Sequence, residues 1–149
     1  IYCYIISRRQ ELSMGMSDAR STGSTSGISN SYDLSKKIEI DLNYTPRTAR
    51  FIAEVSLINI QCSALSSAPK PDKITLKISE DATGNEYVLT ATETDLDYGL
   101  GDNSYATGII RIDGIISLDR ADTVYAHIKT NQGTLTIDQI VITYNDWKK

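Results

Sequence analysis

The clearest alternation of apolar and polar positions lies in residues 122–144, near the carboxyl end of the chain. Two runs rich in Val, Ile, Thr and Tyr flank Asn131, Gln132 and Gly133. Glycine readily adopts the positive φ that a tight reversal of direction requires, so this pattern predicts a β-hairpin. A hairpin alone is only marginally stable in water. We therefore expect the preceding apolar runs to form strands that cover it.

The second strand of this hairpin changes its apolar parity midway. Its apolar positions are Leu135, Ile137, Ile140, Ile142 and Tyr144. The first two share one parity and the last three share the other. A β-bulge near Asp138 and Gln139 would bring all five side chains to the same face of the sheet.

Short apolar stretches recur upstream at the spacing of strands and turns. Strands are predicted over residues 37–42, 51–62, 73–79, 86–92, 105–112 and 115–118, the last two being either separate or one strand bent around Gly114. Residues 51–62 are apolar on both parities, which indicates a central strand. Long loops at residues 63–72 and 94–104 favour Greek-key crossings. The pattern predicts an all-β fold, a two-sheet jelly-roll-like sandwich of about eight antiparallel strands or a related sandwich.

The amino-terminal part differs in composition. Ser, Thr and Gly dominate residues 17–31, and such a segment buries too little apolar surface to offset its ordering entropy. We therefore predict a flexible arm with an apolar tip over residues 1–31 and the sandwich domain over residues 32–149. The apolar tip is too short for a membrane span, and its arginines follow it, unlike those of a signal peptide. Tyr4, Ile5 and Ile6 either add a strand to a neighbouring sheet edge, for instance on another subunit, or belong to a loosely ordered terminus.

Charge and cysteine content exclude several classes of function. The formal net charge is −4, the sequence pI is about 4.9, and the basic residues are scattered, which argues against nucleic acid as the main partner. The two cysteines and the single histidine do not supply a four-ligand zinc site. Cys62 lies in an apolar stretch and is predicted to be a buried free thiol, with a bridge to Cys3 as the alternative.

No catalytic pattern stands out, and we predict neither an enzyme nor a cofactor. Nucleophilic catalysis would have to use His127, which lies mid-strand and is expected at the surface or edge of a sheet. The 19 acidic residues always allow some carboxylate pair to be nominated, so they indicate no acid–base site. Asp95, Asp97 and Asp102 are candidates for a calcium site, but they do not match the spaced ligand loop that closes with a bidentate Glu, and no metal is predicted.

Three aromatic residues are candidates for contact with a glycan. Tyr98 and Tyr105 bracket the loop at residues 94–104, and Trp147 lies near the carboxyl end. Exposed aromatic rings are flat platforms that stack on sugar faces with few rotamers to freeze. The alternative is that the tyrosines close the rims of the core and keep their hydroxyl groups in water.

At the carboxyl hairpin the chain resembles a known class of proteins. The segments YTPRTARFIAEVSLINIQCS, KITLKISEDATGNEY and DTVYAHIKTNQGTLTIDQIVITYNDW are similar to the small single jelly-roll proteins of virus and phage particles, namely penton, minor-capsid and decoration or fibre-head domains. The resemblance covers about residues 36–147. It implies a structural virion protein that assembles as a homo-oligomer, or with other capsid proteins, through its arm and its sheet edges.

A similar closing hairpin occurs in carbohydrate-binding sandwich modules. This second resemblance implies the alternative function, a non-catalytic module that binds carbohydrate or a receptor. The expected location is the virion for the first function and the extracellular space for the second.

Overall fold

The computed structural model describes residues 16–42, 51–64, 69–100, 104–118 and 123–148. Within these ranges the chain forms nine strands and one short 3-10 helix, η1 (Leu34–Lys36). The strands are β1 (Met16–Arg20), β2 (Thr25–Ile28), β3 (Ile38–Asp41), β4 (Phe51–Ser63), β5 (Lys73–Ser79), β6 (Tyr87–Asp97), β7 (Ala106–Leu118), β8 (Thr123–Thr130) and β9 (Leu135–Lys148). The same ranges contain no helix long and apolar enough to cross a membrane.

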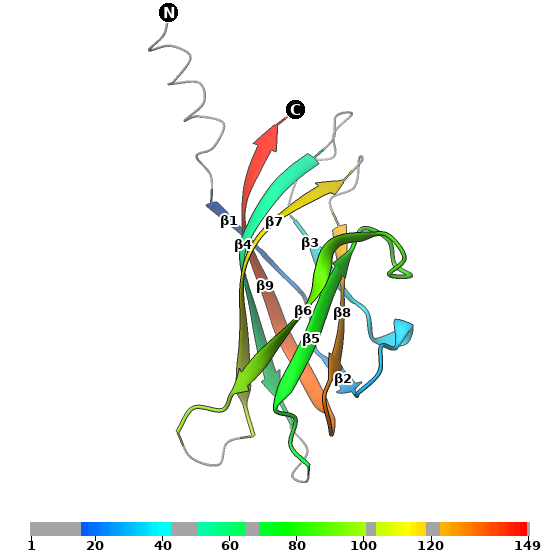
Figure 1. Cartoon of the computed structure of the whole chain (residues 1–149), viewed down its shortest axis with the longest axis vertical. Coiled ribbons are helices and arrows are strands. Elements are labelled where there is room, and N and C mark those ends of the chain that lie inside the picture. Colours follow the sequence, from blue (N-terminus) through cyan, green and yellow to red (C-terminus); the bar gives the residue numbers. More distant parts are fainter. Residues whose placement is uncertain (1–15, 43–50, 65–68, 101–103, 119–122, 149) are drawn as a thin grey trace, which may run out of the picture.

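The strands form two packed layers. Their order is β1-β9-β4-β7-β6-β5-β8-β3, all pairs are antiparallel, and β2 pairs with β9 beside this path. Figure 1 shows β4, β7 and β9 in one layer and β5, β6 and β8 in the other, and the layers join where the end of β6 meets the start of β7. The predicted all-β sandwich is confirmed. The strand predicted as central, β4, pairs with β7 on one side and with β9 on the other.

The core lies between the layers and is built mainly from isoleucine. The predicted bulge in β9 is present: Gln61 pairs with Gln139 and Cys62 with Ile137, so Asp138 is the extra residue. As a result, all five apolar positions of β9 are buried, although they differ in parity. The hydroxyl of Tyr144, the last of them, donates a hydrogen bond to the carbonyl of Leu42, as a buried polar group requires.

The segment predicted as a flexible arm contributes two strands to this sandwich. β1 pairs with β9 along its whole length, and β2 pairs with the start of β9. Each strand buries one apolar side chain in the core, Ala19 in β1 and Ile28 in β2. The Ser21 hydroxyl also accepts a hydrogen bond from the backbone N–H of Ile140, at 2.8 Å. The prediction of a flexible linker is therefore wrong over residues 16–28, because ladder hydrogen bonds to β9 compensate for the polar composition. The apolar tip with Tyr4, Ile5 and Ile6 lies outside the described residues.

The predicted hairpin turn between β8 and β9 also forms hydrogen bonds with the segment that leads into β5. The side-chain oxygen of Asn131 accepts hydrogen bonds from the backbone N–H groups of Asp72 and Lys73, at 3.0 and 3.1 Å. The side-chain amide of Gln132 donates to the carbonyl of Lys70, at 2.6 Å. Gly133 has a φ of 63°. The turn therefore holds the segment 69–73 that leads into β5.

Candidate functional site

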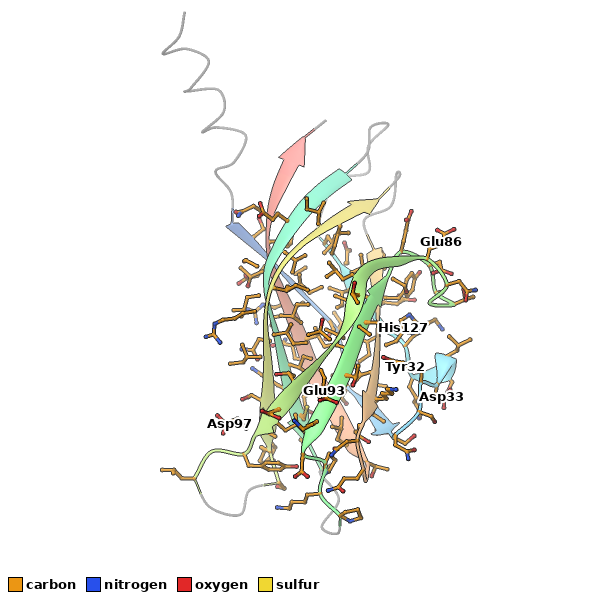
Figure 2. All side chains as sticks on the ribbon, viewed as in Figure 1. Tyr32, Asp33, Glu86, Glu93, Asp97 and His127 are labelled. Atoms are coloured by element: carbon orange, nitrogen blue, oxygen red, sulfur yellow. The ribbon has the colours of Figure 1, made fainter. Side chains whose placement is uncertain are left out.

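A hollow lies at one end of the sandwich, within the described part of the chain. It encloses about 490 Å³ and is lined by Gln61, Cys62, Asp97, Tyr98, Gly99, Tyr105, Ala106, Thr107 and Asp138. These residues come from the end of β4, the end of β6, the start of β7 and the bulge of β9, with the β6–β7 connection beside them. Figure 2 labels Asp97 at this end of the molecule. We call this hollow the β4–β7 pocket.

Two of the three aromatic residues predicted as glycan contacts line the β4–β7 pocket. Tyr105 is 66% exposed at the start of β7. Tyr98 is half-buried, its hydroxyl donates a hydrogen bond to the carbonyl of Pro71, and the ammonium group of Lys70 lies 5.3 Å from its ring centroid. Burial, followed by the negative charge of Asp72, raises the pKa of the Tyr98 hydroxyl. One ring is therefore held in place while the other is open to solvent.

Two carboxylates of the β4–β7 pocket each have one oxygen fixed by the fold. Asp97 accepts a hydrogen bond from the backbone N–H of Gly99, at 2.8 Å. Asp138, the bulged residue, accepts one from the Ser63 hydroxyl, at 2.7 Å. Within the described residues no donor reaches the second oxygen of either group. These oxygens, with the side chains of Gln61 and Thr107, supply the acceptors and donors of the pocket.

Cys62 forms part of the pocket wall and is a buried free thiol, as predicted. It is only 2% exposed. Burial, and secondarily the negative charge of Asp138, raises the pKa of this thiol to about 12. The sulfur is therefore a neutral apolar surface of the pocket at physiological pH.

The remaining predicted site residues lie elsewhere. Trp147 pairs with Ile52, whereas the pocket begins at Gln61, so the two positions stand about 30 Å apart along β4. Asp95 forms an ion pair with Lys73 at 2.7 Å, and Asp102 lies outside the described residues. In the ranges that the structure describes, no group of three His, Cys, Asp or Glu side chains is placed to hold a metal ion.

The prediction that His127 lies at the surface or edge of a sheet is wrong. This side chain is 3% exposed, because the turn after β5 folds over the outer face of β8 and places Gly84 against the imidazole ring. Its Nε2 lies 2.8 Å from the Ser79 hydroxyl oxygen, and that hydroxyl lies 2.7 Å from the carbonyl of Asp81. Since the serine proton goes to this carbonyl, Nε2 carries a proton and donates to the serine oxygen. Figure 2 shows His127 well away from Asp97, so this pair is no part of the pocket.

Comparison with known proteins gives a fold likeness. No family model matches the chain, and no curated protein matches it. Among solved structures, the C-terminal CBM6 of LamC from Zobellia galactanivorans is 14% identical, with 89% of this chain and 94% of that chain covered and a TM-score of 0.38. CBM35 from Paenibacillus barcinonensis is 11% identical, with 88% and 94% covered and a TM-score of 0.34. The cyanophage Pam1 capsid asymmetric unit is 12% identical, with 88% and 84% covered and a TM-score of 0.42. Carbohydrate-binding modules recur among these structures, but scores at this level indicate no function.

Proposed function

We propose that this chain is a non-catalytic carbohydrate-binding module whose ligand occupies the β4–β7 pocket. The observation that carries the proposal is the exposed ring of Tyr105 beside a hollow lined with polar groups. A sugar presents apolar C–H faces and a rim of hydroxyl groups. A binding site therefore needs an aromatic platform next to fixed hydrogen-bonding groups.

The polar groups of the pocket fit a neutral saccharide. Among the described residues, its lining includes two carboxylates, Asp97 and Asp138, and no Lys, Arg or His. Carboxylate oxygens accept hydrogen bonds from vicinal hydroxyl groups, but they repel the carboxylate or sulfate of an acidic sugar. The tether of Tyr98 to Pro71 and the bond from Ser63 to Asp138 arrange part of the site before any ligand arrives, which reduces the entropy cost of binding.

The test is isothermal titration calorimetry with a panel of neutral oligosaccharides, on the full chain and on two variants. Tyr105→Ala should weaken binding about tenfold, because an aromatic contact contributes about 0.5–1.5 kcal/mol beyond its buried area. Leu100→Ala is the matched control: Leu100 is 99% exposed in the same connection but does not line the pocket. Equal losses in both variants, or no saccharide bound by the parent chain, would contradict the proposal. Release of new reducing ends from the bound oligosaccharide would contradict its non-catalytic part.

A structural role in a virion remains a prediction, as does the location in the virion or outside the cell. Its proposed assembly arm, with Tyr4, Ile5 and Ile6, lies outside the described residues. Because β1 and β2 belong to the sandwich, a test of the arm should remove residues 1–15 and keep residues 16–31. Loss of oligomers in that shortened chain would favour assembly through the tip.

A further inference from the structure

A second hollow lies on the outer face of the layer formed by β5, β6 and β8. It encloses about 330 Å³ and is lined by Tyr32, Lys77, Thr90 and Ala91. Lys77 alternates with the buried apolar side chains of β5, so it projects from the outer face of the layer. Figure 2 shows Tyr32 well away from Asp97, which places this hollow apart from the β4–β7 pocket. We call it the Tyr32 hollow.

A β-bulge in β6 forms one wall of the Tyr32 hollow. The ladder between β5 and β6 shifts register there, so that Thr90 and Ala91 together lie opposite Lys77. Such a bulge bends the strand and redirects its side chains. The Thr92 hydroxyl donates a hydrogen bond to the carbonyl of Thr90, at 3.1 Å, which holds the bulge within its own strand. Both bulged residues are exposed, so the wall offers one hydroxyl group and one methyl group to a ligand.

Two ammonium groups converge on the ring of Tyr32, which forms another wall. The Nζ of Lys77 lies 4.3 Å from the ring centroid, and the Nζ of Lys129 lies 5.0 Å from it. The two lysines are diagonal neighbours across the β5–β8 ladder, because Lys77 pairs with His127. The negative face of the ring attracts both cations and keeps them close in spite of their mutual repulsion. An anion in the hollow would be attracted by both charges.

Two carboxylates near the Tyr32 hollow are engaged by other donors. Asp33, next to Tyr32 in the chain, accepts hydrogen bonds from the backbone N–H and the hydroxyl of Ser35, at 2.9 and 2.7 Å. Glu93 lies 3.9 Å from the ammonium group of Lys73. Neither carboxylate lines the hollow, and among its described lining residues Lys77 is the one charged side chain. The local field therefore favours a negative ligand.

We propose that the Tyr32 hollow binds an acidic saccharide through the sulfate or carboxylate group of the sugar. The oxyanion lies at the ammonium groups of Lys77 and Lys129, where charge-assisted hydrogen bonds are strong. A bare oxyanion is only a few times larger than a water molecule, which occupies about 30 Å³ in the liquid. The hollow therefore has room for the sugar ring as well, with the methyl group of Ala91 and the hydroxyl of Thr90 as its further contacts.

The Tyr32 hollow selects ligands by charge in the opposite sense to the β4–β7 pocket, whose carboxylates repel acidic sugars. The net charge of the chain is −4, so the attraction is local. At physiological ionic strength, charges more than about 8 Å away are largely screened, and the two lysines decide the sign of the ligand. The two sites share no lining residue, so this inference and the proposed function stand or fall separately.

Titration of the isotope-labelled full chain, followed by nuclear magnetic resonance at constant ionic strength, tests the site. The probes are a glucose sulfate monoester, glucuronate, glucose and inorganic sulfate. The two acidic sugars should shift the backbone amide signals of Tyr32, Lys77, Thr90 and Ala91, with a dissociation constant of about 1 mM. Glucose should leave these signals in place, and inorganic sulfate should bind at least about fivefold more weakly, because it lacks the ring contacts.

Two substitutions at Thr90 test the charge preference without a change of size. Thr90→Glu should weaken binding of both acidic sugars about tenfold or more, because it places a carboxylate in the hollow. Thr90→Gln is the matched control, since its side chain has nearly the same shape and no charge, and its affinity should stay within about threefold of the parent value. Thr90 is exposed, so both variants should fold, as circular dichroism will show. Lys129→Gln should weaken binding about threefold to tenfold.

Four results would overturn the proposal. Inorganic sulfate that binds as tightly as the acidic sugars would show an adventitious ion only. Glucose that binds as tightly as glucuronate would remove the role of the charge. Equal affinities of Thr90→Glu and Thr90→Gln would place the ligand elsewhere, and so would signal shifts confined to the β4–β7 pocket.

Discussion

Replacing Gly133 with alanine should lower the free energy of unfolding through two effects, backbone strain and a steric clash. The same substitution at a second glycine distinguishes the two effects. Gly133 has a φ of 63°, a conformation that costs an alanine about 1–2 kcal/mol. An added Cβ would also lie 2.2 Å from the backbone carbonyl oxygen of Pro69, far inside ordinary contact distance. The segment around Pro69 is held by the Gln132 hydrogen bond to Lys70, so it cannot move away freely. Overpacking of this kind costs about 1–3 kcal/mol.

Gly23 supplies the matched control for this substitution. Its φ of 72° imposes a similar backbone strain, but an added Cβ would meet nothing within 4 Å. Alanine also lowers the conformational entropy of the unfolded chain, which stabilises the folded state of either variant by about 0.4–1 kcal/mol. Gly23→Ala should therefore cost about 0.5–1 kcal/mol, and Gly133→Ala about 2–4 kcal/mol.

Urea unfolding followed by circular dichroism measures this difference. With an m-value of about 1–3 kcal/mol/M, the midpoint of Gly133→Ala should fall about 1 M below that of Gly23→Ala. Because the Gly133 turn holds the segment that contains Pro71, and Pro71 anchors Tyr98, Gly133→Ala should also weaken saccharide binding by the folded protein. Equal midpoints for the two variants would refute the reasoning, since they would show that the turn and the Pro69 segment do not press on each other.

Two further outcomes follow from buried groups. Burial, then the positive charge of Lys77 across the ladder and that of Lys37, lowers the pKa of His127, against an opposing effect of Asp81. The contribution of the neutral imidazole to stability is therefore fully present above the unfolded pKa of about 6.5 and is lost as the pH falls through the lower folded pKa. The urea midpoint should drop between pH 7.5 and pH 5.5, and His127→Asn should remove most of this drop; an unchanged slope would contradict the assignment. The pKa of the buried Cys62 thiol is raised to about 12. In a Cys3→Ser background, this thiol should therefore not react with an aromatic disulfide reagent at pH 8 until urea unfolds the protein. Rapid labelling of the folded chain would contradict its burial.

Much of the fold follows from the apolar pattern, because strands with one buried face keep a strict parity. The change of parity between Ile137 and Ile140 predicted the bulge at Asp138, and the two apolar faces of residues 51–62 predicted the central position of β4. β1 and β2 were missed because the apolar side chains that the structure describes as buried in them, Ala19 and Ile28, are isolated in the sequence and leave no periodic signal. Their stability comes from pairing with a strand more than a hundred residues away. The composition of a short segment gives no information about such a distant partner.

Only some of the residues that line the β4–β7 pocket could be predicted from the sequence. Tyr98 and Tyr105 could be nominated because they flank one connection. Gln61, Thr107 and Asp138 could not, because the register of β4 with β7 and β9 brings them together. Burial of His127 was likewise hidden, since it depends on a turn that folds back over the outer face of a sheet. Alternation along a strand identifies its two faces but does not say whether another segment covers the outer one.

The central place of β9 has a consequence for how the chain folds. β9 is the last strand in the sequence, yet β1, β2 and β4 all pair with it, and the side chains of Asp18 and Thr143 bond across 125 positions. Contacts of such long sequence separation give a high contact order, which slows folding because the loop entropy is lost before the contacts form. During synthesis β1, β2 and one edge of β4 must remain without their partner until β9 leaves the ribosome, while the β5–β6 hairpin can already form. The amino-terminal strands should therefore be the last to gain protection from hydrogen exchange during refolding.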